Sequence, residues 1–287
     1  MPTIDYEVEY NNRARVPEHQ QIFARWAAEG AAYREARAGA ATIGLKYGPS
    51  TRNTIDLFPP LKPTGDKPPL ALFVHGGWWR SLEPQSFSQM ARGANAHGIN
   101  VAVAGYDLCP TCGIGDIIEQ IRTACLLLWQ RFNQRITVIG HSAGGHLAAC
   151  MLATDWKMLA PDVPEDLVPA AYAISGVFDL MPLASISVNV DLKLTPESAH
   201  KLSPLYWDVD AGRTLDAVVG ALESSEFLRQ SKTIAEAWRQ DEIDTRYEEI
   251  AGTNHFTVLD PLTQADSAMT RRVVELARET EAARISL

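Results

Sequence analysis

The fold is decided by one stretch of sequence, Ile136-Thr137-Val138-Ile139-Gly140-His141-Ser142-Ala143-Gly144. Its four leading β-branched residues predict a buried strand, and the small residues that follow the serine predict a helix. The pattern G-x-S-x-G at this junction is typical of a nucleophile elbow, a turn so tight that the flanking positions must be small. We therefore expect Ser142 to lift its hydroxyl above the edge of a sheet, with a helix N-terminus behind it.

The composition is that of an ordinary soluble globular protein. The chain has 287 residues, of which 46% are hydrophobic and 21% charged. This length fits one large α/β domain or two small ones. No linker or repeat marks a boundary, and the Pro-rich stretch 58–69 reads as an exposed loop. We predict a single domain over residues 1–287.

Charge and cysteine usage narrow the classes of partner and compartment. The net charge is −9 without a basic cluster, so nucleic acid is not an expected partner. No apolar run approaches the roughly 20 residues of a membrane span, and the acidic N-terminus lacks the apolar core of a secretory signal. Cys109 and Cys112 form a C-x-x-C pair without a second pair, which favours reduced structural thiols over a redox or zinc site. We expect a cytoplasmic protein without metal or cofactor, and the sequence leaves a homodimer open.

Strand-like and helix-like segments alternate along the chain. This order predicts an α/β fold with a mostly parallel central sheet and helices on both faces, whose active site lies at the carboxyl ends of the strands. Asp116 and Glu119 resemble a pair that caps a helix, and Pro261 suits the first turn of another. The predicted strands are 54–58, 70–74, 101–104, 136–139, 170–174, 217–222 and 245–250, and the predicted helices are 116–132, 227–239 and 261–283, besides the one after the elbow.

The first forty residues stand apart from this alternation and form an N-terminal helical extension. A helix is expected over Gln21–Ala38. The sequence leaves open whether it packs on the core or leans over the mouth of the pocket.

A serine hydroxyl needs a base and a group that orients the base. His255 follows the predicted strand 245–250 and is the candidate base. In this fold the acid lies between serine and histidine in the chain. Glu223, the first acid after the strand 217–222, is the preferred candidate, and Glu226 and Asp179 are alternatives.

Attack on a carbonyl also needs hydrogen-bond donors where negative charge develops. The segment His75-Gly76-Gly77-Trp78-Trp79 follows a strand, and its glycines allow a substrate to approach the backbone. We expect the N–H groups of Gly77, Trp78 and Ala143 to form an oxyanion hole, and His75 to brace the loop by hydrogen bonding.

These segments together resemble the α/β-hydrolase superfamily, and within it the kynurenine formamidase branch near the hormone-sensitive-lipase-like esterases. The similar segments are 75–79 (H-G-G-x-W), 140–147 (the elbow), 175–183 (S-G-x-x-D-L-x-P), 188–189, 202–204, 223–231 (D-S-P-E-F-x-x-Q-S) and 10–13 near the N-terminus. The resemblance implies that residue 223 is the acid of a catalytic triad. Glutamate stands there instead of aspartate, Trp78 replaces a commoner tyrosine, and Gly145 a frequent alanine.

Aromatic residues cluster in the segments expected near the pocket. A site lined by several of them favours a flat aryl substrate over a long acyl chain. Lining residues are expected among Gly76, Trp79, Phe178, Tyr206 and Trp207, beside Trp78.

The resemblance implies a serine hydrolase that cleaves a small aryl amide or ester through an acyl-enzyme. N-formyl-L-kynurenine, giving kynurenine and formate, is the leading substrate. A short-chain carboxylesterase or another amidase of aromatic degradation is the alternative. A binding protein that has lost catalysis is disfavoured, because Ser142 and His255 are both present.

Overall fold

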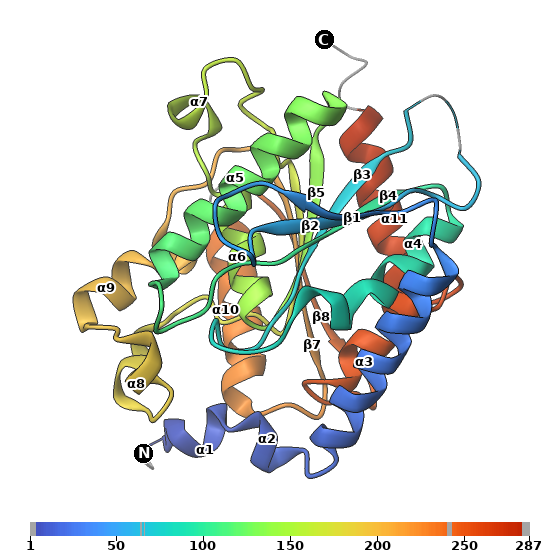
Figure 1. Ribbon diagram of the computed structural model, residues 1–287. Coiled ribbons are helices and arrows are strands. Elements are labelled where there is room, and N and C mark those ends of the chain that lie inside the picture. The colour runs from blue at the N-terminus through green and yellow to red at the C-terminus, as the bar shows by residue number, and fades with distance from the viewer. Residues whose placement is uncertain (1–3, 64, 66, 240–242, 283–287) are drawn as a thin grey trace.

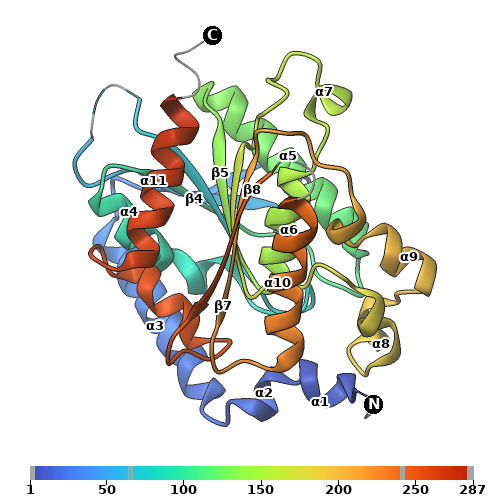
Figure 2. The ribbon, with the colours of Figure 1, turned by 180° about the vertical axis from the view of Figure 1, so that it is seen from behind.

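The structure, a computed structural model, describes residues 4–63, 65, 67–239 and 243–282. Its centre is one eight-stranded sheet in the order β1-β2-β4-β3-β5-β6-β7-β8 (Figures 1 and 2). The β1–β2 and β2–β4 pairs are antiparallel, and every other neighbouring pair is parallel. The strands are β1 Thr42–Lys46, β2 Thr54–Phe58, β3 Leu70–Val74, β4 Asn100–Ala104, β5 Ile136–His141, β6 Ala170–Ile174, β7 Thr214–Gly220 and β8 Asp244–Ile250.

Helices cover both faces of the sheet, as the alternation of elements predicted. The apolar residues of α5, α6 and α10 pack on one face and those of α3, α4 and α11 on the other, in two separate core clusters. Figure 2 shows α11 and α10 on opposite sides of the strands. The helices are α1 Tyr6–Tyr10, α2 Asn12–Arg15, α3 His19–Ala36, α4 Arg92–Ala96, α5 Ile114–Phe132, α6 Ala143–Leu152, α7 Trp156–Leu159, α8 Asn189–Leu192, α9 Pro196–Lys201, α10 Ser225–Arg239 and α11 Ala268–Ala282.

The central strands are buried from end to end because both of their faces are covered. All residues of β3, β4, β5 and β6 are buried, and their parallel register brings Val74, Gly140 and Ala173 side by side. Their carboxyl ends therefore meet at one edge of the sheet. In Figures 1 and 2, α1 and α2 cross below this edge.

The predicted strands are all found, with ends shifted by up to three residues. The largest shift concerns β7, predicted over 217–222 and observed at Thr214–Gly220. It ends early because Glu223 N–H donates to the Gly220 carbonyl and turns the chain. Strand β1, which pairs antiparallel with β2, was not predicted.

The helix starts were predicted less accurately: α3 and α10 both begin two residues before the predicted positions 21 and 227. The cap of α5 is Gly113, and Asp116 lies three positions into the helix, where its carboxylate accepts from Gly113 N–H at 2.8 Å. The helix predicted from Pro261 is divided into a 3-10 helix, Thr257–Thr263, and α11. The Pro261 carbonyl accepts from Ser267 and Thr270 hydroxyls, which turns the chain between the two. Residue 283, where that helix was predicted to end, lies outside the described residues.

Candidate active site

The elbow is built as the motif predicts. Ser142 lies between β5 and α6 with φ 57° and ψ −117°, a strained conformation for a residue with a side chain. A Cβ at Gly140 would lie 1.9 Å from the Gly144 carbonyl oxygen, and one at Gly144 would lie 2.0 Å from that of Val74. Glycine is therefore required at both positions, and Ser142 is held at the carboxyl edge of the sheet.

Three side chains form one hydrogen-bonded chain at this edge. The distance from Ser142 Oγ to His255 Nε2 is 3.0 Å, and that from His255 Nδ1 to Glu223 Oε2 is 2.6 Å. Because the carboxylate can only accept, His255 Nδ1 carries the proton and Nε2 is free to accept from the serine. The geometry is that of a nucleophile, a base and an orienting acid.

Glu223 is the acid that reaches His255, although it stands where the resembling family has aspartate. Its second oxygen, Oε1, accepts from Ser175 Oγ at 2.6 Å and from Gly220 N–H at 2.7 Å. The side chain is thus fixed at both oxygens, so the longer glutamate adopts one orientation. Ser175 was not recognised from the sequence as a partner of this acid.

The two alternative acids have other roles. Glu226 forms a buried ion pair with Arg229 at 2.8 Å and accepts from the Tyr10 hydroxyl at 3.0 Å. Asp179 accepts from Met181 N–H at 3.0 Å within its own loop. Neither is bonded to His255.

The loop after β3 presents free backbone donors toward Ser142. Gly77, Trp78 and Trp79 all have positive φ, of 114°, 56° and 53°. The Gly77 carbonyl accepts from Ser81 Oγ at 2.9 Å, while the N–H groups of Gly77, Trp78 and Ala143 donate to no other group in the described part of the chain. Gly77 and Trp78 line the cavity beside Ser142, and Ala143 begins α6 directly behind it. These are the three donors that the sequence predicted for the oxyanion.

Burial keeps the nearby histidines neutral. It lowers the pKa of His75 to about 4, and this ring donates to the Gly76 carbonyl at 2.7 Å between the stacked rings of Tyr106 and Phe87. His75 therefore braces the loop, as predicted. Burial lowers the pKa of His146 to about 4 as well, and its Nε2–H donates to the Leu202 carbonyl at 2.7 Å, away from the serine.

His141 lies close to the site without belonging to the Ser142–His255–Glu223 chain. Its Nε2–H donates to the His255 carbonyl at 2.7 Å, and the two rings are 4.9 Å apart. Burial, and then the neighbouring His255, lower the pKa of His141 well below its usual value. It holds the His255 loop in place and lines the cavity.

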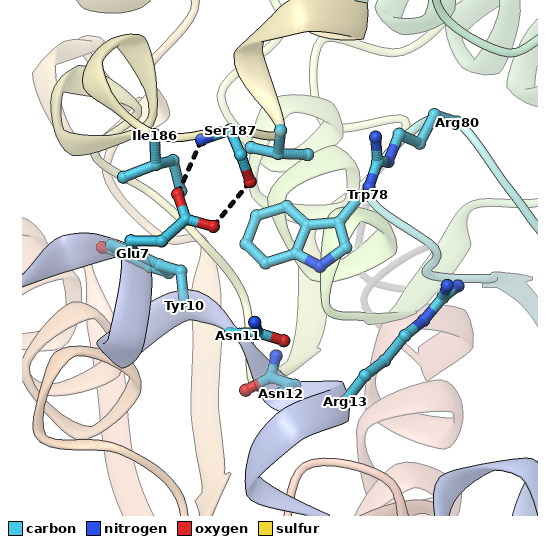
Figure 3. A pocket seen from close by; sticks show the side chains of 10 residues that line it. Glu7, Tyr10, Asn11, Asn12, Arg13, Trp78, Arg80, Ile186 and Ser187 are labelled. Atoms are coloured by element: carbon cyan, nitrogen blue, oxygen red, sulfur yellow. Dashed lines mark hydrogen bonds between the residues drawn. The ribbon is translucent and has the colours of Figure 1, made fainter.

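A small inner cavity adjoins Ser142, and a larger outer cavity shares part of its wall. The inner cavity, against Ser142 and His255, has a volume of about 30 Å³, space for on the order of one or two water molecules. The outer cavity, of about 140 Å³, lies between the N-terminal segment and the 186–188 loop (Figure 3). Trp78, Asn12 and Arg13 line both.

The predicted pocket aromatics are placed elsewhere. Trp79 and Phe178 are fully buried in the core, Tyr206 stacks on His200 at the surface, and Trp207 lies under Arg122. Gly76 packs under the serine, where a Cβ would lie 2.9 Å from Ser142 Cβ. None of these five residues lines either cavity, so the prediction that they form the walls of the pocket was wrong. The residues that the sequence did not identify there are Asn12, Arg13, Phe23, Trp26, Leu82, His141 and Phe256 in the inner cavity.

The chain contains the alternation, the elbow and the loop donors of one fold family, and the comparisons with known proteins agree. Residues 71–259 match the model of a family described as having the alpha/beta hydrolase fold. The chain belongs to the α/β-hydrolase family. This hydrolase is 30% identical over 242 residues to kynurenine formamidase of Salmo salar, covering 82% of this chain and 81% of that protein.

Two further relatives extend the similarity. Kynurenine formamidase of Danio rerio is 27% identical over 241 residues, with 82% of the hydrolase and 81% of the relative covered. A crystal structure of a candidate thioesterase from Silicibacter sp. tm1040 superimposes with a TM-score of 0.85 at 31% identity, over 94% of this chain and 99% of that one. The family and these relatives make the chain a hydrolase of the amidase and esterase type.

The cysteines of the C-x-x-C pair line neither cavity. Burial raises the pKa of the Cys109 thiol to about 11 and that of Cys112 to about 12, and neither is in a disulfide. Within the described ranges, no group of three or more His, Cys, Asp or Glu side chains could hold a metal ion. Over the same ranges, no helix is both long and apolar enough to cross a membrane.

Proposed function

We propose that the hydrolase cleaves the formyl amide of N-formyl-L-kynurenine, giving kynurenine and formate. The observation that carries this proposal is the small inner cavity, about 30 Å³, directly against the Ser142–His255–Glu223 chain. A formyl group carries only a hydrogen on its carbonyl carbon and fits in this volume, whereas a long acyl chain does not. The formamidase relatives support the same substrate.

The first half of the reaction forms an acyl-serine. Ser142 Oγ attacks the formyl carbon while its proton moves to His255 Nε2, and Glu223 stabilises the imidazolium. The N–H groups of Gly77, Trp78 and Ala143 stabilise the oxyanion. The tetrahedral intermediate collapses when His255 returns the proton to the aryl nitrogen, and the amine leaves.

The second half releases formate. Water gives its proton to His255 as it attacks the formyl-serine, and a second oxyanion forms at the same donors. Collapse breaks the bond to Ser142 Oγ, which takes the proton back from His255. Both halves use side chains and backbone N–H groups of this chain together with one water molecule.

The alternative is a short-chain ester hydrolase, which the likeness to a candidate thioesterase favours. The test is kcat/KM on N-formyl-L-kynurenine beside p-nitrophenyl acetate and butyrate, with Ser142→Ala as the blank. We expect a strong preference for the formamide that the variant abolishes. Serine-dependent turnover of the esters with almost none of the formamide would refute the formamidase assignment and leave an esterase.

A further inference from the structure

The wall between the two cavities is made by the N-terminal segment. Asn12 and Arg13 of α2, together with the Trp78 indole, line both the inner and the outer cavity. Figure 3 shows Asn12 below the Trp78 indole and Arg13 extending from α2 to the right of the view, on the same side as Arg80. When the acyl group of a substrate lies at Ser142, its leaving group must therefore extend past these two residues.

Both residues carry hydrogen-bond donors without an acceptor. Asn12 is only 4% exposed, and its Nδ2 has no partner in the described chain. A buried amide donor left without a partner is uncommon and points to a missing ligand. The Arg13 guanidinium pairs with no carboxylate in the described chain and lies 5.7 Å from the centre of the Phe23 ring.

The neighbouring charged groups already have partners within the chain, and the Ser187 hydrogen bonds lower the pKa of Glu7 so that it stays ionised. Arg80, which also lines the outer cavity, pairs with Asp191 at 2.5 Å. Glu7 is the one acidic residue in that lining among the described residues, and its two carboxylate oxygens accept from Ser187 N–H and Oγ at 2.7 and 2.6 Å. Arg13 therefore remains a free cation beside the site.

The segment that carries the donors is firmly anchored. Tyr10 is 2% exposed, donates to Glu226, and accepts from Gln230 Nε2 at 2.8 Å. Its ring lies 5.5 Å from that of Phe227, which in turn lies 4.5 Å from the His255 ring. The backbone that carries these donors is thus held in place relative to the base before any ligand binds.

We propose that Asn12 and Arg13 form a subsite for a carboxylate on the leaving-group side of the scissile bond. The proposal rests on the function proposed above and names its substrate class as aryl amides or esters whose leaving group bears a carboxylate. A guanidinium binds a carboxylate through charge-assisted, often bidentate hydrogen bonds. The Asn12 amide supplies a further donor in the same wall.

The test compares substrates with and without the carboxylate. The amide pair is N-formyl-L-kynurenine and neutral 2′-formamidoacetophenone, and the ester pair is 3-acetoxybenzoate and its methyl ester. Arg13→Gln and Asn12→Asp are expected to lower kcat/KM for the carboxylate member by about tenfold to a hundredfold, mainly through KM. The neutral member should lose clearly less than the carboxylate member, because it makes no charged contact with the two residues.

Arg15→Gln is the matched control. Arg15 is the other arginine of α2, lines neither cavity, and lies 3.9 Å from Glu9. Its loss should leave both members of each pair unchanged. Arg13→Lys keeps the charge and should restore part of the preference, which separates loss of charge from disturbance of the fold.

Equal losses for charged and neutral substrates, or no loss for either, would overturn the subsite. Failure of the proposed function gives a different pattern. If the wild type ignores both formamides but prefers the charged ester in an Arg13-dependent way, the formamidase assignment fails and the subsite stands.

Discussion

The elbow and the N-terminal segment meet at the same cavity but are built in opposite ways. The elbow is local: within nine residues, two glycines and a strand–helix junction place Ser142. The N-terminal segment reaches the site through contacts with residues more than 200 positions away, such as Tyr10 with Glu226 and Gln230. The difference indicates that the nucleophile is fixed by short-range structure, whereas the wall that selects the substrate is assembled from distant parts of the chain.

Two acids three residues apart provide the sharpest test of this division. Glu223→Gln should lower kcat by roughly a thousandfold to ten-thousandfold, because an amide no longer holds His255 in the required tautomer. Glu226→Gln should instead loosen the anchor of Tyr10, raise KM and lower Tm, with kcat close to that of the wild type. Steady-state kinetics and thermal melts of both variants separate the roles. A large loss of kcat in Glu226→Gln alone would reverse the assignment of the acid.

The rigidity of the elbow can be tested at Gly144. Gly144→Ala should lower the free energy of unfolding by about 3 kcal/mol or prevent folding, because the new Cβ would lie 2.0 Å from the Val74 carbonyl oxygen. Gly115→Ala in α5 is the matched control, since its Cβ would meet Leu202 Cδ2 at an ordinary 3.6 Å. That change should be neutral or stabilise by up to about 1 kcal/mol. Urea denaturation of both variants measures the contrast, and equal midpoints would contradict it.

Lowering the pH should destabilise the folded protein around the elbow, because His75 and His146 are buried there with pKa values of about 4. The unfolded chain takes up these protons near pH 6.5, but the folded chain does so only near pH 4. Stability therefore falls as pH decreases through this window, by about 1.4 kcal/mol per pH unit for each histidine.

Urea denaturation at several pH values between 4 and 7 checks this loss. His146→Gln should reduce the slope by the contribution of one histidine, whereas His200→Gln, at an exposed position, serves as the control. An unchanged slope in His146→Gln would show that another group causes the loss.

The smallest expected effect concerns the anchor itself. Tyr10→Phe removes a hydroxyl bonded to Glu226 and Gln230, so stability should fall by about 1–2 kcal/mol. KM should rise with little change in kcat, because the wall shifts while the reactive groups stay in place. Tyr6→Phe, which removes a hydroxyl without a hydrogen bond in the described chain, should change neither. A fall in kcat without a change in KM would contradict the separation of wall and reactive groups.

Local sequence patterns predicted those strands well whose signal lies entirely within the strand itself. The runs at 70–74 and 170–174 match β3 and β6 at both ends, because buried strands show as unbroken apolar stretches. The run at 54–58 also matches β2 at both ends, although Asp56 interrupts its apolar residues. The closing helix was misplaced, since a proline was read as a helix start while the hydroxyls that turn the chain at Pro261 come from residues six and nine positions later. Strand β1 has only partly buried or exposed residues, so it lacks the apolar signal.

The sequence by itself determined the elbow and the loop donors, because each depends on backbone geometry within a few residues. The order of serine, acid and histidine followed from the chain order that is typical of this fold. Only the tertiary structure decided that Trp79 and Phe178 belong to the core while Asn12 and Arg13 line the site. The direction in which an aromatic ring points depends on what packs around it, and this packing involves residues far apart in the chain. An aromatic residue of the core and one that lines a cavity therefore cannot be told apart from the sequence.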